Sequence, residues 1–192
     1  MSKKESSFLN MLVTLLIITI IAGLSLGFIN EVTKKPKAKA KLERKIKALK
    51  LVLPEFTNNP VKDIILVKSE KVKDSIEIYP ALNNNKKVGK AIVGSSNKGF
   101  SGLIKLIVGF RQDGVIQDIV VLEQKETPGL GTKMKDEKYL KQYREKNPTN
   151  YNLKVKKDGG QIDALTGATI SSRAFSEAVL MAHGEFMKVA DK

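Results

Sequence analysis

Cysteine is absent from this chain, and histidine occurs only once, as His183. Without cysteine the chain offers no ligands for an iron–sulfur cluster, no c-type haem attachment, no thiolate zinc site, no disulfide and no lipidated cysteine. One histidine cannot supply bis-histidine haem ligation or a histidine-rich metal site. Any redox centre must therefore be organic, and we expect no metal site.

Acidic residues are also scarce, with 20 Asp and Glu against 34 Lys and Arg. A basic chain has nucleic acid, an anionic membrane surface or an acidic protein as its possible partners. The basic residues concentrate between Lys34 and Lys50, directly after an apolar run, and the later sequence lacks the mixed aromatic and basic residues typical of base stacking. This placement favours a membrane surface, and we expect no nucleic-acid binding.

The apolar run extends from Phe8 to Ile29 and carries no charge. Its length, about 33 Å at ~1.5 Å per residue, is enough to cross a bilayer. A signal peptide usually has a shorter apolar region of about 7–15 residues and a small-residue cleavage site. We therefore expect a retained transmembrane helix at 8–29, following a short tail at 1–7.

A basic helical stalk is predicted at 30–54, because Leu42, Leu49 and Leu53 fall near one helical face and Pro54 ends the helix. The stalk either lifts the domain off the membrane or lies along it, or it is a solvated helix without a binding role. More lysines follow the apolar run than precede it, so the positive-inside rule favours a cytoplasmic body.

Residues 55–192 are long enough for one compact domain. Five segments have the composition of strands, at 64–67, 75–79, 88–93, 103–110 and 115–122. Asp113-Gly114 is a hairpin turn signal, and the nearly continuous apolar residues of 103–110 indicate a strand covered on both faces. Helices are expected near 137–144 and from about 171 to 190. The fold class is α+β, a mostly antiparallel sheet with packed helices.

The segment with the clearest chemical potential is Thr166-Gly167-Ala168-Thr169, between a strand-like stretch at 162–165 and the last helix. Gly167 permits a tight turn, and the first N–H groups of a helix attract a phosphate. A hydroxyl at this place is positioned for esterification. The same pattern is also that of an ordinary N-cap, with Thr169, Ser171 and Ser172 as capping residues, and spacing alone favours the cap.

A second segment, Glu126-Thr127-Pro128-Gly129-Leu130-Gly131, has the composition of a rigid loop. Pro128 fixes one φ angle, and the two glycines expose backbone N–H groups. Such a loop can press against a flat isoalloxazine ring. Taken alone, the segment is more simply a surface turn.

Both segments resemble motifs of the FMN-binding domain family. Thr166-Gly167-Ala168-Thr169, preceded by Asp163, is similar to its flavinylation motif, and 126–131 is similar to its second loop. The resemblance implies FMN linked to Thr169 through a phosphoester, made by a separate flavin transferase that uses FAD. The implied cofactor-binding residues are Thr169, Thr166, Gly167, Ala168, Ser171, Glu126, Thr127, Gly129, Leu130 and Gly131.

With its anchor and stalk, nearly the whole chain resembles the G subunits of Rnf complexes, which are ion-pumping ferredoxin:NAD+ oxidoreductases. This resemblance implies an electron-relay subunit of a redox enzyme, with no catalytic residue of its own and with other Rnf subunits and membrane lipid as partners. It also implies a single-pass protein of the cell inner membrane whose flavin domain faces outward, in contrast to the lysine count. The lysines would then contact anionic headgroups of the outer leaflet.

Three other functions fit the same features. One is that of the C subunit of the Na+-translocating NADH:quinone oxidoreductase, which is usually longer, and another is that of a stand-alone flavoprotein of the outer surface. The third is a membrane-tethered binding module without a cofactor, for which Thr169→Ala would change neither spectrum nor partner binding.

Overall fold

The computed structural model describes residues 8–68 and 75–190, so the predicted tail at 1–7 lies outside the described residues. The chain forms two compact units that meet between Glu43 and Arg44, and helix α1 (Phe8–Val52) contributes to both. In the first unit, α1 is long and apolar enough to cross a membrane, and its apolar side chains are exposed. This agrees with the predicted transmembrane segment. Helical structure continues through Pro36 into the predicted stalk.

The second unit contains a sheet of five antiparallel strands in the order β1-β2-β3-β4-β5, so each strand pairs with its neighbour in sequence. The strands are β1 (Ile65–Val67), β2 (Ile76–Asn83), β3 (Lys86–Gly99), β4 (Gly102–Arg111) and β5 (Ile116–Glu123). All five predicted strands are therefore present, in the expected α+β fold. The β3–β4 hairpin is longer than predicted, because pairing continues to Gly99 opposite Gly102.

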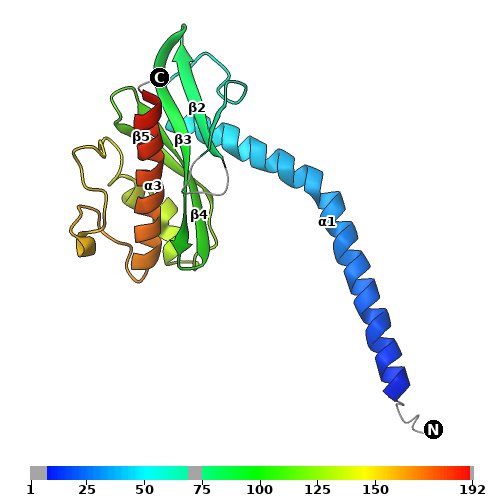
Figure 1. Ribbon diagram of the computed structural model, residues 1–192. Coiled ribbons are helices and arrows are strands. Elements are labelled where there is room, and N and C mark those ends of the chain that lie inside the picture. Colours follow the sequence, from blue (N-terminus) through cyan, green and yellow to red (C-terminus); the bar gives the residue numbers. More distant parts are fainter. Residues whose placement is uncertain (1–7, 69–74, 191–192) are drawn as a thin grey trace. The chain divides into compact units, whose positions relative to one another are not determined.

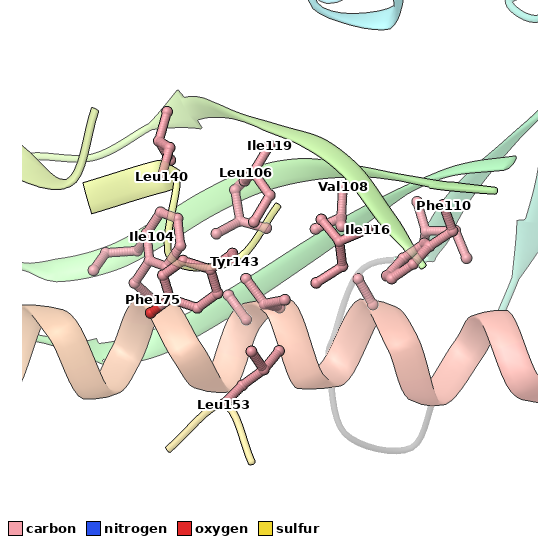
Figure 2. Close-up of a cluster of buried hydrophobic side chains, with 14 of the residues drawn as sticks. Ile104, Leu106, Val108, Phe110, Ile116, Ile119, Leu140, Tyr143, Leu153 and Phe175 are labelled. Atoms are coloured by element: carbon pink, nitrogen blue, oxygen red, sulfur yellow. The ribbon is translucent and has the colours of Figure 1, made fainter. Parts of the chain in front are cut away.

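One face of the sheet is covered by helix α3 (Thr169–Ala190), drawn in orange to red in Figure 1. Alternate residues of β4, among them Leu106, Val108 and Phe110, point to this face and belong to one buried cluster with residues of α3 such as Phe175 (Figure 2). The helix approaches closely at Gly94 of β3, where a Cβ atom would lie 2.1 Å from the carbonyl oxygen of Ala178. The largest apolar core of the domain lies between α3 and the sheet.

The other face is covered by the end of α1. Its residues Leu49 and Val52 are buried against the intervening residues of the strands, such as Ile107 of β4. At Gly109 an added Cβ atom would lie 1.8 Å from the carbonyl oxygen of Val52, so no side chain fits there. Both faces of β4 are thus covered, as its apolar sequence predicts, and the compact unit begins at Arg44, before the expected domain start at residue 55.

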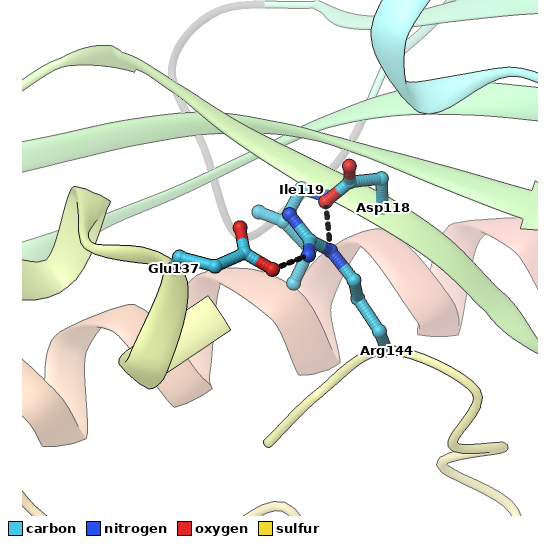
Figure 3. A network of polar contacts seen from close by, with 4 residues as sticks. All are labelled: Asp118, Ile119, Glu137 and Arg144. Atoms are coloured by element: carbon cyan, nitrogen blue, oxygen red, sulfur yellow. Dashed lines mark hydrogen bonds and ion pairs between the residues drawn. The ribbon is translucent and has the colours of Figure 1, made fainter. Parts of the chain in front are cut away.

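Three short helices connect β5 to α3: η1 (Gly131–Lys135), α2 (Glu137–Leu140) and η2 (Lys156–Asp158). Helix α2 ends earlier than the predicted 144, in a series of turns that leads to Glu145 at φ 59°. Figure 3 shows Arg144 bridging this segment to the sheet, with Nε donating to Asp118 at 2.6 Å and Nη1 donating to Glu137. These contacts hold the connecting segment, which carries part of the site, against β5.

Candidate functional site

A cavity of about 430 Å³ lies where four parts of the domain meet. They are the tip of the β3–β4 hairpin, the loop after β5, helix η2 and the start of α3. The cavity is lined by Phe100, Glu126, Thr127, Leu130, Gly131, Lys157, Gly167, Ala168, Thr169, Ile170 and Ser171. Its volume is within the range of small-molecule sites, roughly 300–1,000 Å³. The two sequence motifs therefore lie together, although about 40 residues separate them.

The turn before α3 is built by residues 165–168. Its closing hydrogen bond runs from Ala168 N to Leu165 O at 2.9 Å, and Gly167 has φ 74° at the third position, where a residue with a side chain is strained. Ser172 reaches back from the helix, accepting from Leu165 N at 2.9 Å and donating to Ala168 O at 3.0 Å. The predicted strand at 162–165 was wrong: only a single bridge is present, between Ile162 and Val155, because the backbone of Leu165 is already engaged in the turn.

Helix α3 begins at Thr169, half-buried in the cavity wall. Among the described residues, Ser172 is the first of the helix whose amide donates to the preceding turn, to Ala168 O at 3.0 Å. The amides of Thr169, Ile170 and Ser171 are thus the donors that every helix leaves without a partner at its start, in the positive part of its dipole. An anion in the cavity beside the Thr169 hydroxyl satisfies these donors.

Glu126 follows β5 and is buried next to the first turn of α3, with 4% of its surface exposed. Its Oε2 accepts a hydrogen bond from Ser171 Oγ at 2.5 Å, and its Oε1 accepts one from the backbone N of Ser101 at 2.9 Å. One carboxylate therefore joins the β3–β4 hairpin, the loop after β5 and α3. Gly131 packs directly against this group, since an added Cβ atom would lie 2.7 Å from Glu126 Cβ and 2.8 Å from Ser171 Oγ.

Apolar side chains surround the cavity at its opening. Phe100, Leu130 and Ile170 line it while remaining 68%, 42% and 48% exposed. Exposed apolar side chains that converge on a polar floor are typical of sites for flat, amphipathic ligands. Phe100, Ile170 and Lys157 are not among the residues predicted from the sequence. An aromatic residue between Gly99 and Gly102 at a hairpin tip was a usable signal for the first, whereas nothing local distinguishes the other two.

Eight of the ten predicted cofactor-binding residues line the cavity. The exceptions are Thr166 and Gly129, which shape the two turns: Thr166 is exposed, and Gly129 N donates to Thr132 Oγ1 at 3.0 Å. The residues present fit FMN in chemical terms. Helix amides suit its phosphate, and the apolar rim suits the isoalloxazine ring.

Comparison with known proteins agrees with this geometry. The model of the FMN-binding domain family matches residues 99–183, which include both motifs and the β3–β4 hairpin tip. The fold is similar to the crystal structure of the C subunit of the Na+-translocating NADH-quinone reductase from Parabacteroides distasonis. That comparison has a TM-score of 0.50 and 17% identity, and it covers 70% of this chain and 69% of the other.

Two curated relatives extend the similarity to most of the chain. The G subunit of the ion-translocating oxidoreductase complex of Aliivibrio fischeri is 36% identical, over 77% of this chain and 75% of the relative. The G subunit of the Na+-translocating ferredoxin:NAD+ oxidoreductase complex of Acetobacterium woodii is 30% identical, over 87% of this chain and 86% of the relative. The chain carries an FMN-binding domain and belongs to the family of the G subunits of ion-translocating oxidoreductase complexes.

Proposed function

We propose that this chain relays electrons within a membrane-bound ion-translocating ferredoxin:NAD+ oxidoreductase of the Rnf type, through FMN linked covalently to Thr169. One observation carries the proposal: Thr169 lines a cavity of ligand size at the start of α3, together with Glu126 and the apolar rim. The names of the relatives support the assignment to such a complex.

The proposed attachment is a phosphoryl transfer from FAD, carried out by a flavin transferase. The Thr169 oxygen forms a bond to the phosphorus that bears riboflavin, the pyrophosphate P–O bond breaks, AMP leaves, and the hydroxyl proton passes to the transferase or to solvent. The product phosphodiester keeps one negative charge. That charge suits the free amides at the start of α3.

Bound flavin would supply the one- and two-electron chemistry that lets the protein connect different carriers. The chain itself binds and orients. Leu130 and Phe100 would contact the ring, and Glu126 would keep the two loops and the helix in register. The apolar rim is exposed in this domain, so a ring held there can come close to the redox centres of partner subunits. No residue of the chain needs to act as an acid, a base or a nucleophile in the relay.

For the membrane, we propose a single span at 8–29 in the cell inner membrane, with the FMN-binding domain on the outer side. Helix α1 supports the span by its length and apolar composition. The lysines that follow it, such as Lys35 and Lys39, are exposed on the helix and suited to anionic lipid headgroups. Accessibility of single introduced cysteines to a membrane-impermeant thiol reagent in intact cells would test the side, because the chain has no cysteine of its own.

The decisive experiment is co-expression of the full chain with a flavin transferase, followed by flavin fluorescence in a denaturing gel. We expect a fluorescent band for the wild type and none for Thr169→Ala. Thr149→Ala is the matched control, since Thr149 is exposed and lies outside the cavity and both motifs, and it should retain fluorescence. A dark wild-type band, with the transferase active on a known substrate, would refute the covalent flavin and favour the tethered binding module.

A further inference from the structure

Lys157 stands out among the cavity residues because it is the only cation of the lining set. It lies in η2, beside two other lysines, Lys154 and Lys156. Lys156 is engaged, with its Nζ 2.7 Å from Asp163 Oδ1, and Lys154 does not line the cavity. In the described part of the chain, Lys157 Nζ makes no ion pair or hydrogen bond with protein. A cation that faces a ligand cavity without a partner is available to an anionic group.

The backbone that carries Lys157 is held firmly against α3. Arg173, in the first turns of that helix, donates to Asp158 from Nε and Nη2, both at 2.7 Å. These bonds lower the pKa of Asp158, so the pair stays ionised at neutral pH. Lys156 N also donates to Ile162 O at 2.8 Å, which ties η2 to the segment before the turn. Lys157 is therefore fixed at its Cα, and only its side chain is free to move.

The groups that line the cavity include both donors and one carboxylate. The carboxylate of Glu126 is already engaged, because its two oxygens accept from Ser171 Oγ at 2.5 Å and from Ser101 N at 2.9 Å. The first amides of α3 and the ammonium of Lys157 attract a phosphate, and Thr169 lines the same cavity. An anionic group of a ligand is therefore most favourable near the start of α3, where these donors are available.

We propose that Lys157 binds the phosphate of the flavin nucleotide at this site, both before and after the phosphoester to Thr169 forms. The inference rests on the proposed function and adds a recognition residue from outside both sequence motifs. Lys157 is a positioning residue: it holds the phosphoryl group beside the acceptor hydroxyl and does not itself take part in bond formation. The ligand class it selects is a flavin mononucleotide, in preference to the phosphate-free riboflavin.

The test compares FMN with riboflavin, because the two differ only in the phosphate. Full-length protein made without a flavin transferase, in dodecyl maltoside, is titrated with each flavin while flavin fluorescence quenching is followed. We expect the wild type to prefer FMN, and Lys157→Gln to reduce that preference by about three- to fivefold at low salt, the range of one exposed charge pair. Lys141→Gln, which removes an exposed lysine outside the cavity, should leave the preference unchanged.

A second measurement uses the loaded protein and does not depend on weak binding. The 31P resonance of the phosphodiester should shift in Lys157→Gln and stay in place in Lys141→Gln. The inference is overturned if the 31P shift is unaffected by Lys157→Gln, or if FMN preference is absent in the wild type or unchanged in the variant. A wild-type protein that acquires no flavin from an active transferase would instead refute the proposed function, so the two failures are distinguishable.

Discussion

Gly131 offers the sharpest test of how the site is assembled, because the structure leaves no space there for a side chain. In Gly131→Ala the new Cβ atom would lie 2.7 Å from Glu126 Cβ, 2.8 Å from Ser171 Oγ and 2.9 Å from Glu126 Oε2. Ordinary contacts between carbon atoms are about 3.5–4.0 Å, so these groups must move by about 1 Å. A movement of that size lengthens the 2.5 Å bond between Ser171 and Glu126 to about the limit of a hydrogen bond.

The expected loss of stability follows from two effects. Overpacking costs about 1–3 kcal/mol, and a buried carboxylate that loses a hydrogen bond costs about 1–3 kcal/mol. The two costs do not add in full, because the same movement of Glu126 and Ser171 that relieves the overpacking also weakens their hydrogen bond. We therefore expect the free energy of unfolding to fall by about 2–4 kcal/mol. For a domain of this size, that corresponds to a fall in Tm of about 6–12 °C. Flavin loading of Gly131→Ala should fall as well, since the loop and α3 no longer meet in register.

The assay is urea or thermal unfolding followed by tyrosine fluorescence, because the chain has no tryptophan and Tyr79 and Tyr143 are buried. Gly184→Ala is the matched control: it adds the same methyl group to α3, where no atom lies within 4 Å. Helix propensity predicts a gain of about 0.5–1 kcal/mol there. If Gly131→Ala proves as stable as Gly184→Ala, the packing of Gly131 against the Glu126–Ser171 pair is not what holds the site together.

Two further predictions concern the core and pH. Leu106→Ala should lower the free energy of unfolding by about 2–5 kcal/mol in the same urea assay, because this side chain is fully buried. Leu66 is 62% exposed, so Leu66→Ala should change the free energy of unfolding by less than about 0.5 kcal/mol. Equal effects of the two substitutions would contradict the assigned core. Burial alone raises the pKa of Glu77, but hydrogen bonds from Lys45 and Tyr79 outweigh it and hold that pKa below its usual 4.5. The resulting stabilisation is complete above pH 4.5 and is lost as the pH falls towards the folded-state pKa. In Glu77→Gln the difference in free energy of unfolding between pH 7 and pH 4 should be smaller than in the wild type by up to about 1 kcal/mol, as measured by urea titrations at the two pH values. An unchanged pH dependence would contradict the assignment of this stabilisation to the Glu77 carboxylate.

A strand could be predicted from the sequence where its buried faces require apolar residues. The β4 segment is apolar at nearly every position because α3 covers one face and the end of α1 covers the other. The far end of β3 was not predictable in this way. Its residues 94–99 are small or polar and are held by backbone pairing with β4, which leaves no hydrophobic pattern to detect.

The candidate site was predictable where its residues follow one another in sequence. The turn before α3 and the loop after β5 are each a continuous segment, so their residue types alone suggest a phosphate-binding turn and a loop that exposes its backbone. Phe100 and Lys157 enter from a hairpin tip and from a short helix, and only the topology brings them to the same cavity. The strand expected at 162–165 failed because Ile162 is buried in the core and Leu165 packs against the same core from the turn, so both are apolar without belonging to a strand.

The place of α3 in the chain has a consequence for biosynthesis. This helix carries Thr169 at its first turn, follows every strand in sequence and covers the face of the sheet that holds the largest core. Until it has been synthesised and has docked, that face is open to water, and the pocket has neither its acceptor hydroxyl nor one of its walls. A transferase that recognises the assembled pocket would therefore modify only chains that have completed folding, so that flavin content would report on the quality of the fold.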